Sequence, residues 1–212
     1  MTIRAVVFDA FGTLVHLGER RYPFRALQTL MHAAGHIKQP TDAARIMTND
    51  VGLAGTAAMF GVQLSVTDLA PIERDLHAEL ETVRLFPESV GVLEELAARG
   101  LKLGLCSNLA APYALPIRLL LPMTLDAYAW SFEVGALKPQ PAIYANVCRQ
   151  LGCEPGDVLM VGDTPEADLH GPRQFGMRSL LLRRENHDAN DGSAIRDLRG
   201  VLACLSTYEA DS

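Results

Sequence analysis

The stretch VVFDAFGTL at residues 6–14 is a short apolar run that delivers one carboxylate, Asp9, and then breaks at Gly12. A run of this length that is rich in β-branched and aromatic residues and ends in a glycine is typical of a buried parallel strand. A charge in the protein interior is costly unless it is paired or bound to a metal. We therefore expect Asp9 at the carboxyl end of this strand, where an open α/β sheet has its ligand crevice. On this stretch alone, Asp9 as a cap of the next turn is an equally good interpretation.

Apolar runs alternate with helical patterns along most of the remaining chain. Four further strands are predicted, at residues 101–106, 128–132, 158–161 and 178–182. Helices are predicted between them, with apolar residues three and four positions apart and glycines at their ends. The polar residues 183–193 are predicted to form a loop. Strands that alternate with helices form βαβ units, so the fold class is α/β, with a parallel sheet covered by helices on both faces.

Residues 16–85 interrupt this alternation. Helical patterns are predicted near residues 22–34, 41–47 and 67–83, and no run in this region is typical of a strand. The alternation of strands and helices resumes after Phe86-Pro87. We therefore predict a core formed by residues 1–15 and 86–212, with an all-helical insert at residues 16–85.

The composition and net charge exclude several kinds of partner. The 212 residues carry a formal net charge of −6, so the chain lacks the basic surface that binds a nucleic-acid backbone. No apolar run approaches the length of a membrane span, and we expect no leader segment ahead of the first strand. The four cysteines form no CxxC pair and no metal-ligand spacing, and they fit reduced thiols in a cytosol. We expect a cytoplasmic protein that binds neither nucleic acid nor membrane.

Polar side chains follow the predicted strands at their carboxyl ends. Asp9, Ser107 and Asp163 each follow a strand directly, and Lys138 lies in the loop after the weakest strand. In a parallel sheet these ends share one edge, so the side chains converge, and Asp168 can join them from the turn beyond Asp163. Alone, each residue fits a turn, a helix cap or a solvated lysine; together, in this order, they predict a site. The set offers a nucleophilic carboxylate, a hydroxyl and a lysine for an anion, and carboxylates for a hard divalent cation.

These motifs resemble those of the haloacid dehalogenase-like (HAD) superfamily of hydrolases. The matching segments, in the family's order, are VVFDAFGT at 6–13, LCSN at 105–108, Lys138-Pro139 and VGDTPEAD at 161–168. The match spans residues 1–15 and 86 to about 205. It implies a Rossmann-like core, and the helical insert corresponds to the family's mobile cap. The motifs are specific for the superfamily and much less specific for the substrate.

The resemblance implies catalytic roles. Asp9 would be the nucleophile, forming an aspartyl-phosphate in phosphatases. Ser107, Asn108 and Lys138 would hold the transferring group, and Ser107 and Lys138 would offset its charge. Thr13 would help to fix the loop that carries the nucleophile. The substrate implied is a small molecule, most simply a phosphate ester of a metabolite.

The resemblance also implies a Mg²⁺ site. Asp9, Asp163 and the backbone carbonyl of Phe11 would hold the ion, and Asp168 would bind it directly or through another ligand. The cation and the lysine would let an anionic carboxylate approach an anionic phosphoryl group, which is the electrostatic work expected of such sites.

Phe11 departs from the pattern of the family's phosphatases, which usually carry a second aspartate two residues after the nucleophile. That aspartate protonates the leaving group and later activates water, and phenylalanine does neither. Positioned acid–base catalysis is worth roughly 100- to 10,000-fold. A Mg²⁺-dependent phosphatase, slow or served by a substitute acid such as His16 or Glu19, is our first hypothesis. The third hypothesis is a binding or regulatory module whose catalysis is weakened; the second, a dehalogenase, is described below.

The second hypothesis is a metal-independent 2-haloacid dehalogenase, in which the nucleophile displaces halide and needs no acid. An aromatic residue at the Phe11 position resembles that subfamily. Against it, those enzymes replace the first acidic residue of the fourth motif by a small polar residue, and this chain retains Asp163. The arginine with which they cradle the halide is not identified among Arg20, Arg21 and Arg25.

Overall fold

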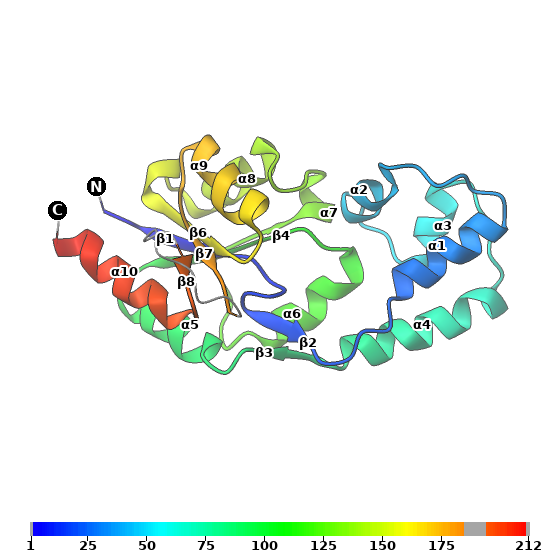
Figure 1. The fold of residues 1–212 in the computed structure, drawn as a ribbon, viewed down its shortest axis with the longest axis horizontal. Helices are drawn as coiled ribbons and strands as arrows, with labels where there is room; N and C mark the ends of the chain where they lie inside the picture. Colours follow the sequence, from blue (N-terminus) through cyan, green and yellow to red (C-terminus); the bar gives the residue numbers. More distant parts are fainter. Residues whose placement is uncertain (1, 185–193, 211–212) are drawn as a thin grey trace.

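The structure is a computed structural model of the chain and describes residues 2–184 and 194–210. Most of the polar segment 183–193, predicted to be a loop, lies outside the described residues. One six-stranded parallel sheet lies in the left-hand part of the molecule in Figure 1, in the order β5-β4-β1-β6-β7-β8. Its strands are β1 (Ala5–Phe8), β4 (Lys102–Ser107), β5 (Ala127–Trp130), β6 (Val158–Gly162), β7 (Arg178–Leu182) and β8 (Ala194–Ile195). The predicted α/β fold with a parallel sheet is confirmed.

β1 lies in the middle of the sheet, between β4 and β6. The strands that follow in sequence are added first on one side, as β4 and β5, and then on the other, as β6, β7 and β8. The strand order therefore reverses at β1, and ligands of open α/β sheets bind outside the carboxyl ends of the strands at such a switch point. Asp9 is the first residue after β1, and its backbone N–H donates to the carbonyl of Val161 on β6 (2.9 Å).

Alternate residues of β1 face the two sides of the sheet, and helices cover both sides. Val6 and Phe8 belong to one apolar cluster, together with residues of α5 (Ser89–Ala98), α6 (Ala114–Leu120) and α10 (Arg199–Ala210). Ala5 and Val7 belong to the other cluster, together with residues of α8 (Pro141–Leu151). The shorter helical segments are η1 (Ala111–Tyr113), α7 (Ser131–Val134), η2 (Pro155–Asp157), η3 (Pro165–His170) and α9 (Gly171–Phe175).

Four helices lie together at one end of the molecule, on the right in Figure 1. They are α1 (Pro23–Ala33), α2 (Asp42–Met47), α3 (Leu53–Met59) and α4 (Val66–Leu80). They enclose a third apolar cluster, which includes Leu27, Met31 and Leu76. α4 begins at a capping box in which Ser65 and Asp68 bond each other's backbone N–H groups. The predicted helical insert after the first strand is therefore present; that it is a mobile cap stays a prediction.

The prediction that residues 16–85 contain no strand is wrong at both ends of the insert. β2 (Val15–Leu17) pairs antiparallel with β3 (Val83–Leu85), so the chain leaves and re-enters the core as a two-stranded ribbon. Three residues per strand are too few for a period-two pattern to stand out in the sequence. Among the described residues, no helix is long and apolar enough to cross a bilayer.

Candidate active site

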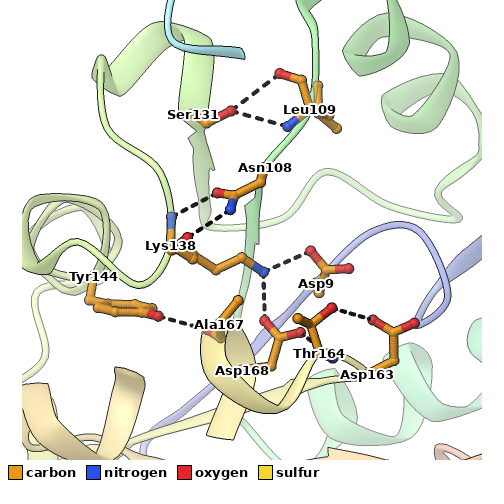
Figure 2. A network of polar contacts seen from close by, with 10 residues as sticks. All are labelled: Asp9, Asn108, Leu109, Ser131, Lys138, Tyr144, Asp163, Thr164, Ala167 and Asp168. Atoms are coloured by element: carbon orange, nitrogen blue, oxygen red, sulfur yellow. Dashed lines mark hydrogen bonds and ion pairs between the residues drawn. The ribbon is translucent and has the colours of Figure 1, made fainter. Parts of the chain in front are cut away.

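The predicted site residues meet at the carboxyl edge of the sheet. Asp9 follows β1, Ser107 is the last residue of β4, and Asp163 follows β6. These side chains line one hollow of about 240 Å³, whose wall consists of Asp9, Phe11, Ser107, Asn108, Lys138, Asp163, Thr164 and Ala167. Figure 2 shows the polar contacts around it. The structure therefore places the motifs around a single cavity, as expected from a parallel sheet.

Lys138 is the centre of the polar network (Figure 2). Its ammonium Nζ donates to Asp9 Oδ1 (2.7 Å) and to Asp168 Oδ1 (2.6 Å), and its side chain is only 2% exposed. Burial alone would lower the pKa of this ammonium, but the charges of Asp9 and Asp168 outweigh burial and raise the pKa. Lys138 therefore stays protonated and neutralises part of the carboxylate charge.

Asn108 fixes the backbone of Lys138. Its side-chain oxygen accepts from the Lys138 N–H (2.7 Å), and its amide nitrogen donates to the Lys138 carbonyl (2.9 Å). The next residue, Leu109, is held in turn by Ser131, whose hydroxyl bonds both its N–H and its carbonyl. Asn108 thus has a positioning role in the structure, in addition to lining the hollow where its predicted role is to bind substrate.

Asp168 lies on η3 and is fully buried. Its Oδ1 accepts from Lys138 Nζ, and its Oδ2 accepts from the Thr164 N–H (2.9 Å). Gly162 makes room for this carboxyl, because a Cβ at residue 162 would lie 2.2 Å from Asp168 Cγ. Burial raises the pKa of Asp168 in spite of the nearby ammonium. Tyr144 anchors η3 from α8, since its hydroxyl donates to the carbonyl of Ala167 (2.7 Å).

Asp163 lies against the turn that follows Asp9. Gly12 adopts a positive φ of 83°, and a Cβ there would approach Asp163 Oδ2 to 2.0 Å, so only glycine allows this contact. Thr164 Oγ1 donates to Asp163 Oδ1 (3.2 Å). Partial burial, and then the charge of Asp9, raise the pKa of Asp163. Within the described part of the chain, no cationic side chain pairs with this carboxylate.

The three aspartates form a donor set that fits a divalent cation. Asp9, Asp163 and Asp168 each offer one oxygen, and these oxygens lie within 4.8 Å of one another. Oxygen ligands of this kind suit Mg²⁺ or Ca²⁺. Both Asp168 oxygens already accept hydrogen bonds, whereas Oδ2 of Asp9 and of Asp163 accept none from other described residues. The place of the Phe11 carbonyl in this set stays a prediction.

The remaining predicted residues differ in position. Ser107 is 2% exposed and lines the hollow. Thr13 is completely buried and does not line the hollow, and its hydroxyl oxygen has no hydrogen-bond partner among the described residues. His16 lies on β2 with its ring 5.0 Å from that of Phe86, and Glu19 pairs with Arg21 (3.1 Å). Neither His16 nor Glu19 lines the hollow, so the structure gives no support to them as substitute acids.

The sequence reasoning missed an aromatic contact beside the nucleophile. The ring of Phe11 meets that of Tyr113 edge to face, with centroids 5.7 Å apart. The Tyr113 hydroxyl donates to Glu79 Oε1 on α4 (2.5 Å). Glu79 could have been noticed, since it follows Ile72 and Leu76 on the buried face of that helix. No pattern in the sequence pointed to Tyr113.

A second hollow, of about 250 Å³, borders Tyr113 on the side of the helical insert. Two of the arginines considered for a halide cradle, Arg20 and Arg25, line it together with Phe24 and Glu79. Arg21 instead pairs with Glu19 and Asp75. None of the three arginines lines the hollow that contains Asp9.

Comparisons with known proteins agree with this architecture. A family model described as a haloacid dehalogenase-like hydrolase matches residues 3–176. The chain is 31% identical over 195 residues to an N-acetylmuramic acid 6-phosphate phosphatase of Pseudomonas aeruginosa, covering 86% of this chain and 83% of the relative. It is 26% identical over 214 residues to the (S)-2-haloacid dehalogenase 4A of Burkholderia cepacia, covering 88% and 85%.

Among solved structures, a HAD phosphatase from Thermococcus onnurineus superimposes with a TM-score of 0.63 at 22% identity, covering 96% of this chain and 98% of that one. This likeness supports the fold. The match of the family model to most of the chain is the stronger finding, and the higher identity to the phosphatase than to the dehalogenase favours the phosphatase type. The chain belongs to the haloacid dehalogenase-like hydrolases.

Proposed function

We propose that the protein is a Mg²⁺-dependent phosphatase that acts on a small phosphorylated metabolite, with Asp9 as the nucleophile. One observation carries the proposal: three carboxylates converge to within 4.8 Å beside the ammonium group of Lys138. Among the described residues, Lys138 is the one cation paired with these carboxylates, so the cluster stays net negative and would repel a phosphate ester. A bound divalent cation would neutralise this surplus negative charge, and oxygen donors of this kind suit such an ion.

The contacts of Asp9 suggest how it attacks. Its Oδ1 is held by Lys138, while Oδ2 accepts no hydrogen bond from the other described residues and is the oxygen we assign to attack. The bond from phosphorus to the leaving oxygen breaks as the bond from Oδ2 to phosphorus forms. Water then cleaves the aspartyl-phosphate, which releases inorganic phosphate and restores Asp9. Ser107 and Lys138 hold the phosphoryl oxygens, and a bound Mg²⁺ would offset their charge.

The leaving group meets an apolar wall. Phe11 lines the hollow that contains Asp9. Tyr113, which contacts the Phe11 ring edge to face, donates its hydroxyl proton to a hydrogen bond with Glu79. No carboxylic acid stands at the position from which the family's phosphatases usually protonate the leaving oxygen. We therefore expect leaving groups of low pKa, which depart without a proton, to react fastest.

The test measures phosphate release from p-nitrophenyl phosphate with Mg²⁺ and with EDTA. We expect turnover that requires Mg²⁺ and disappears in Asp9→Asn. A parallel assay measures halide release from 2-chloropropionate without metal. Metal-independent halide release would overturn the proposal. Absence of both phosphate and halide release would also overturn it and would favour a binding module.

A dehalogenase is the second candidate, because an aromatic residue stands at position 11 and one relative is named as a haloacid dehalogenase. In that reaction the carbon–halogen bond breaks as Asp9 forms an ester, and no acid is needed. The carboxylate of Asp163 argues against a dehalogenase. This group adds negative charge where a carboxylate substrate and a halide would have to bind. The two assays above separate the candidates.

A further inference from the structure

Arg184 lies outside the four motifs, yet its guanidinium group reaches the loop of the nucleophile. It follows β7 at the carboxyl edge of the sheet, two residues beyond the end of the strand. Its Nε donates to the carbonyl of Gly12 (3.1 Å), and its Nη2 donates to the carbonyl of Thr13 (2.8 Å). These carbonyls belong to the turn between Asp9 and β2. The side chain thus crosses from β7 over β6 to the loop of β1.

The same guanidinium holds the segment by which the chain returns from the helical insert. Arg184 Nη1 pairs with Glu88 Oε1 (2.6 Å), and the guanidinium carbon lies 3.5 Å from the centre of the Phe86 ring. Both partners are well shielded: the Arg184 side chain is 21% exposed and that of Glu88 is 11% exposed. Burial raises the pKa of Glu88, but the hydrogen bond from Arg184 and the other contacts lower it on balance, so the pair is ionic near neutral pH.

This set of contacts requires arginine. The planar guanidinium offers donors in several fixed directions and stacks on an aromatic face, whereas a lysine ammonium is a single point of charge. Two donors are used on the catalytic loop and one on Glu88, while the face covers Phe86. Lysine would keep the charge and lose most of these contacts together.

The position of this loop matters for the candidate site. Gly12 lies directly against Asp163, and Phe11, whose carbonyl is a predicted Mg²⁺ ligand, precedes it. A shift of the Gly12 and Thr13 carbonyls therefore moves the backbone that sets the distance from Asp9 to Asp163. The returning segment is fixed to the same loop from the other side, since the Phe86 N–H (3.0 Å) and Ser89 Oγ (2.9 Å) both donate to the carbonyl of Leu14.

We propose that Arg184 is a positioning residue, which holds the catalytic loop at Gly12–Thr13 against the returning segment Phe86–Glu88 and so fixes the geometry around Asp9. It touches no reacting atom. The rate effect of the proposal rests on the phosphatase function proposed above, whereas the structural effect does not. A misplacement of about 1 Å costs about 100-fold in rate in well-fitted sites.

The experiment compares Arg184→Lys and Arg184→Ala with Arg173→Lys in the full-length protein. Arg173 is the control, because its guanidinium likewise donates to a backbone carbonyl, that of Ser179, and also to the Ser179 hydroxyl, far from the nucleophile loop in sequence. Hydrogen exchange is followed in peptides covering residues 9–15 and 86–89, where the N–H groups of Gly12, Leu14 and Phe86 have defined acceptors. Turnover of p-nitrophenyl phosphate is measured on the same samples.

We expect exchange in these peptides to become at least about tenfold faster in both Arg184 variants, and unchanged in Arg173→Lys. We expect kcat to fall about 10- to 100-fold with little change in KM, and low millimolar guanidinium to restore part of kcat in Arg184→Ala. Unchanged exchange in residues 9–15 would overturn the proposal, as would an equal loss of kcat in Arg173→Lys. If the wild-type protein releases no phosphate, the proposed function fails, and the exchange data still decide the role of Arg184. If Arg184→Ala does not fold, Arg184→Lys, which keeps the charge, decides it.

Discussion

The Tyr113 hydroxyl donates a hydrogen bond to Glu79 Oε1 over 2.5 Å and so joins the core to helix α4 of the insert. The other oxygen of Glu79 accepts from the backbone N–H groups of Arg21 and Tyr22, where the chain enters the insert in a left-handed conformation at Tyr22 (φ 56°). Burial, the hydrogen bond and the charge of Glu79 together raise the pKa of Tyr113, so its proton stays on the hydroxyl. Glu79, on α4, therefore connects that helix to Tyr113 and to the segment Arg21–Tyr22.

Removal of this hydrogen bond should loosen the contact between core and insert. We expect Tyr113→Phe to lower the free energy of unfolding by about 1.5–3 kcal/mol, because the acceptor is a charged group that is 3% exposed. Urea unfolding measures this loss, with Glu79→Gln and the double variant completing a cycle. Purely additive losses in the cycle would show that the two residues do not interact.

Replacement of Phe11 by aspartate should supply the missing acid. We expect Phe11→Asp to raise kcat about 100-fold for alkyl phosphates, whose leaving groups need a proton, and to change p-nitrophenyl phosphate turnover little. Phe11→Asn is the control, because it removes the same ring and carries no acid. Equal rates for the two variants on alkyl phosphates would argue that protonation of the leaving group is not what limits this enzyme.

Lys138 should matter for folding as well as for activity. Its removal leaves Asp9 and Asp168 without their shared cation, and breaking a buried ion pair costs about 3–5 kcal/mol. We expect Lys138→Met to lower the free energy of unfolding by that amount and to abolish turnover. Asp9→Asn should abolish turnover but lower the free energy of unfolding much less, because Lys138 still forms its ion pair with Asp168. A loss of stability as large in Asp9→Asn as in Lys138→Met would contradict this division of charge.

The Asp163 carboxyl should make the stability of the metal-free protein depend on pH, and it should be needed for activation by Mg²⁺. Its pKa is raised in the folded state by burial and by Asp9, so the folded state binds a proton that the unfolded state releases. Between the usual pKa of an aspartate and this raised value, the contribution of Asp163 to the stability of the metal-free protein falls as pH rises. We therefore expect Asp163→Asn to make the metal-free protein more stable at pH 7, and to abolish activation by Mg²⁺. Melting curves between pH 4 and pH 7, with EDTA, measure the first effect; a variant that melts below wild type at pH 7 would contradict it.

A structural feature can be predicted from the sequence when it depends on residues that are close together along the chain. Asp9, Ser107 and Asp163 were placed at one edge because each directly follows an apolar run, and runs of that kind are visible one strand at a time. Lys138 lies in a loop, but that loop follows a predicted strand, and the shared edge of a parallel sheet is enough to predict that Lys138 lies near Asp9. The alternation of strands and helices predicts the α/β fold, and the order of the motifs predicts the family; both predictions are confirmed.

Other features depend on contacts between residues far apart in the chain, which no local sequence pattern predicts. The bonds from Arg184 to the catalytic loop join residues more than 170 positions apart, and Tyr113 meets Glu79 across 34. His16 is a candidate acid in the sequence because it stands at the start of the insert. The β2–β3 ribbon, too short to be recognised, carries it instead to Phe86. A charged residue on the apolar face of a predicted helix, such as Glu79, is a sequence signal that indicates a buried polar contact.

Two glycines offer a last test of how tightly the site is built. A Cβ at Gly162 would meet Asp168 Cγ at 2.2 Å, whereas a Cβ at Gly91, inside α5, would meet nothing within 4 Å. We expect Gly162→Ala to cost about 1–3 kcal/mol through overpacking, and to reduce turnover because Asp168 must shift from Lys138. Gly91→Ala should instead stabilise the protein by about 0.5–1 kcal/mol, because alanine loses less backbone entropy in a helix. Urea unfolding and turnover of both variants check this contrast. If Gly162→Ala keeps wild-type turnover, the close approach of residue 162 to Asp168 is not needed for catalysis.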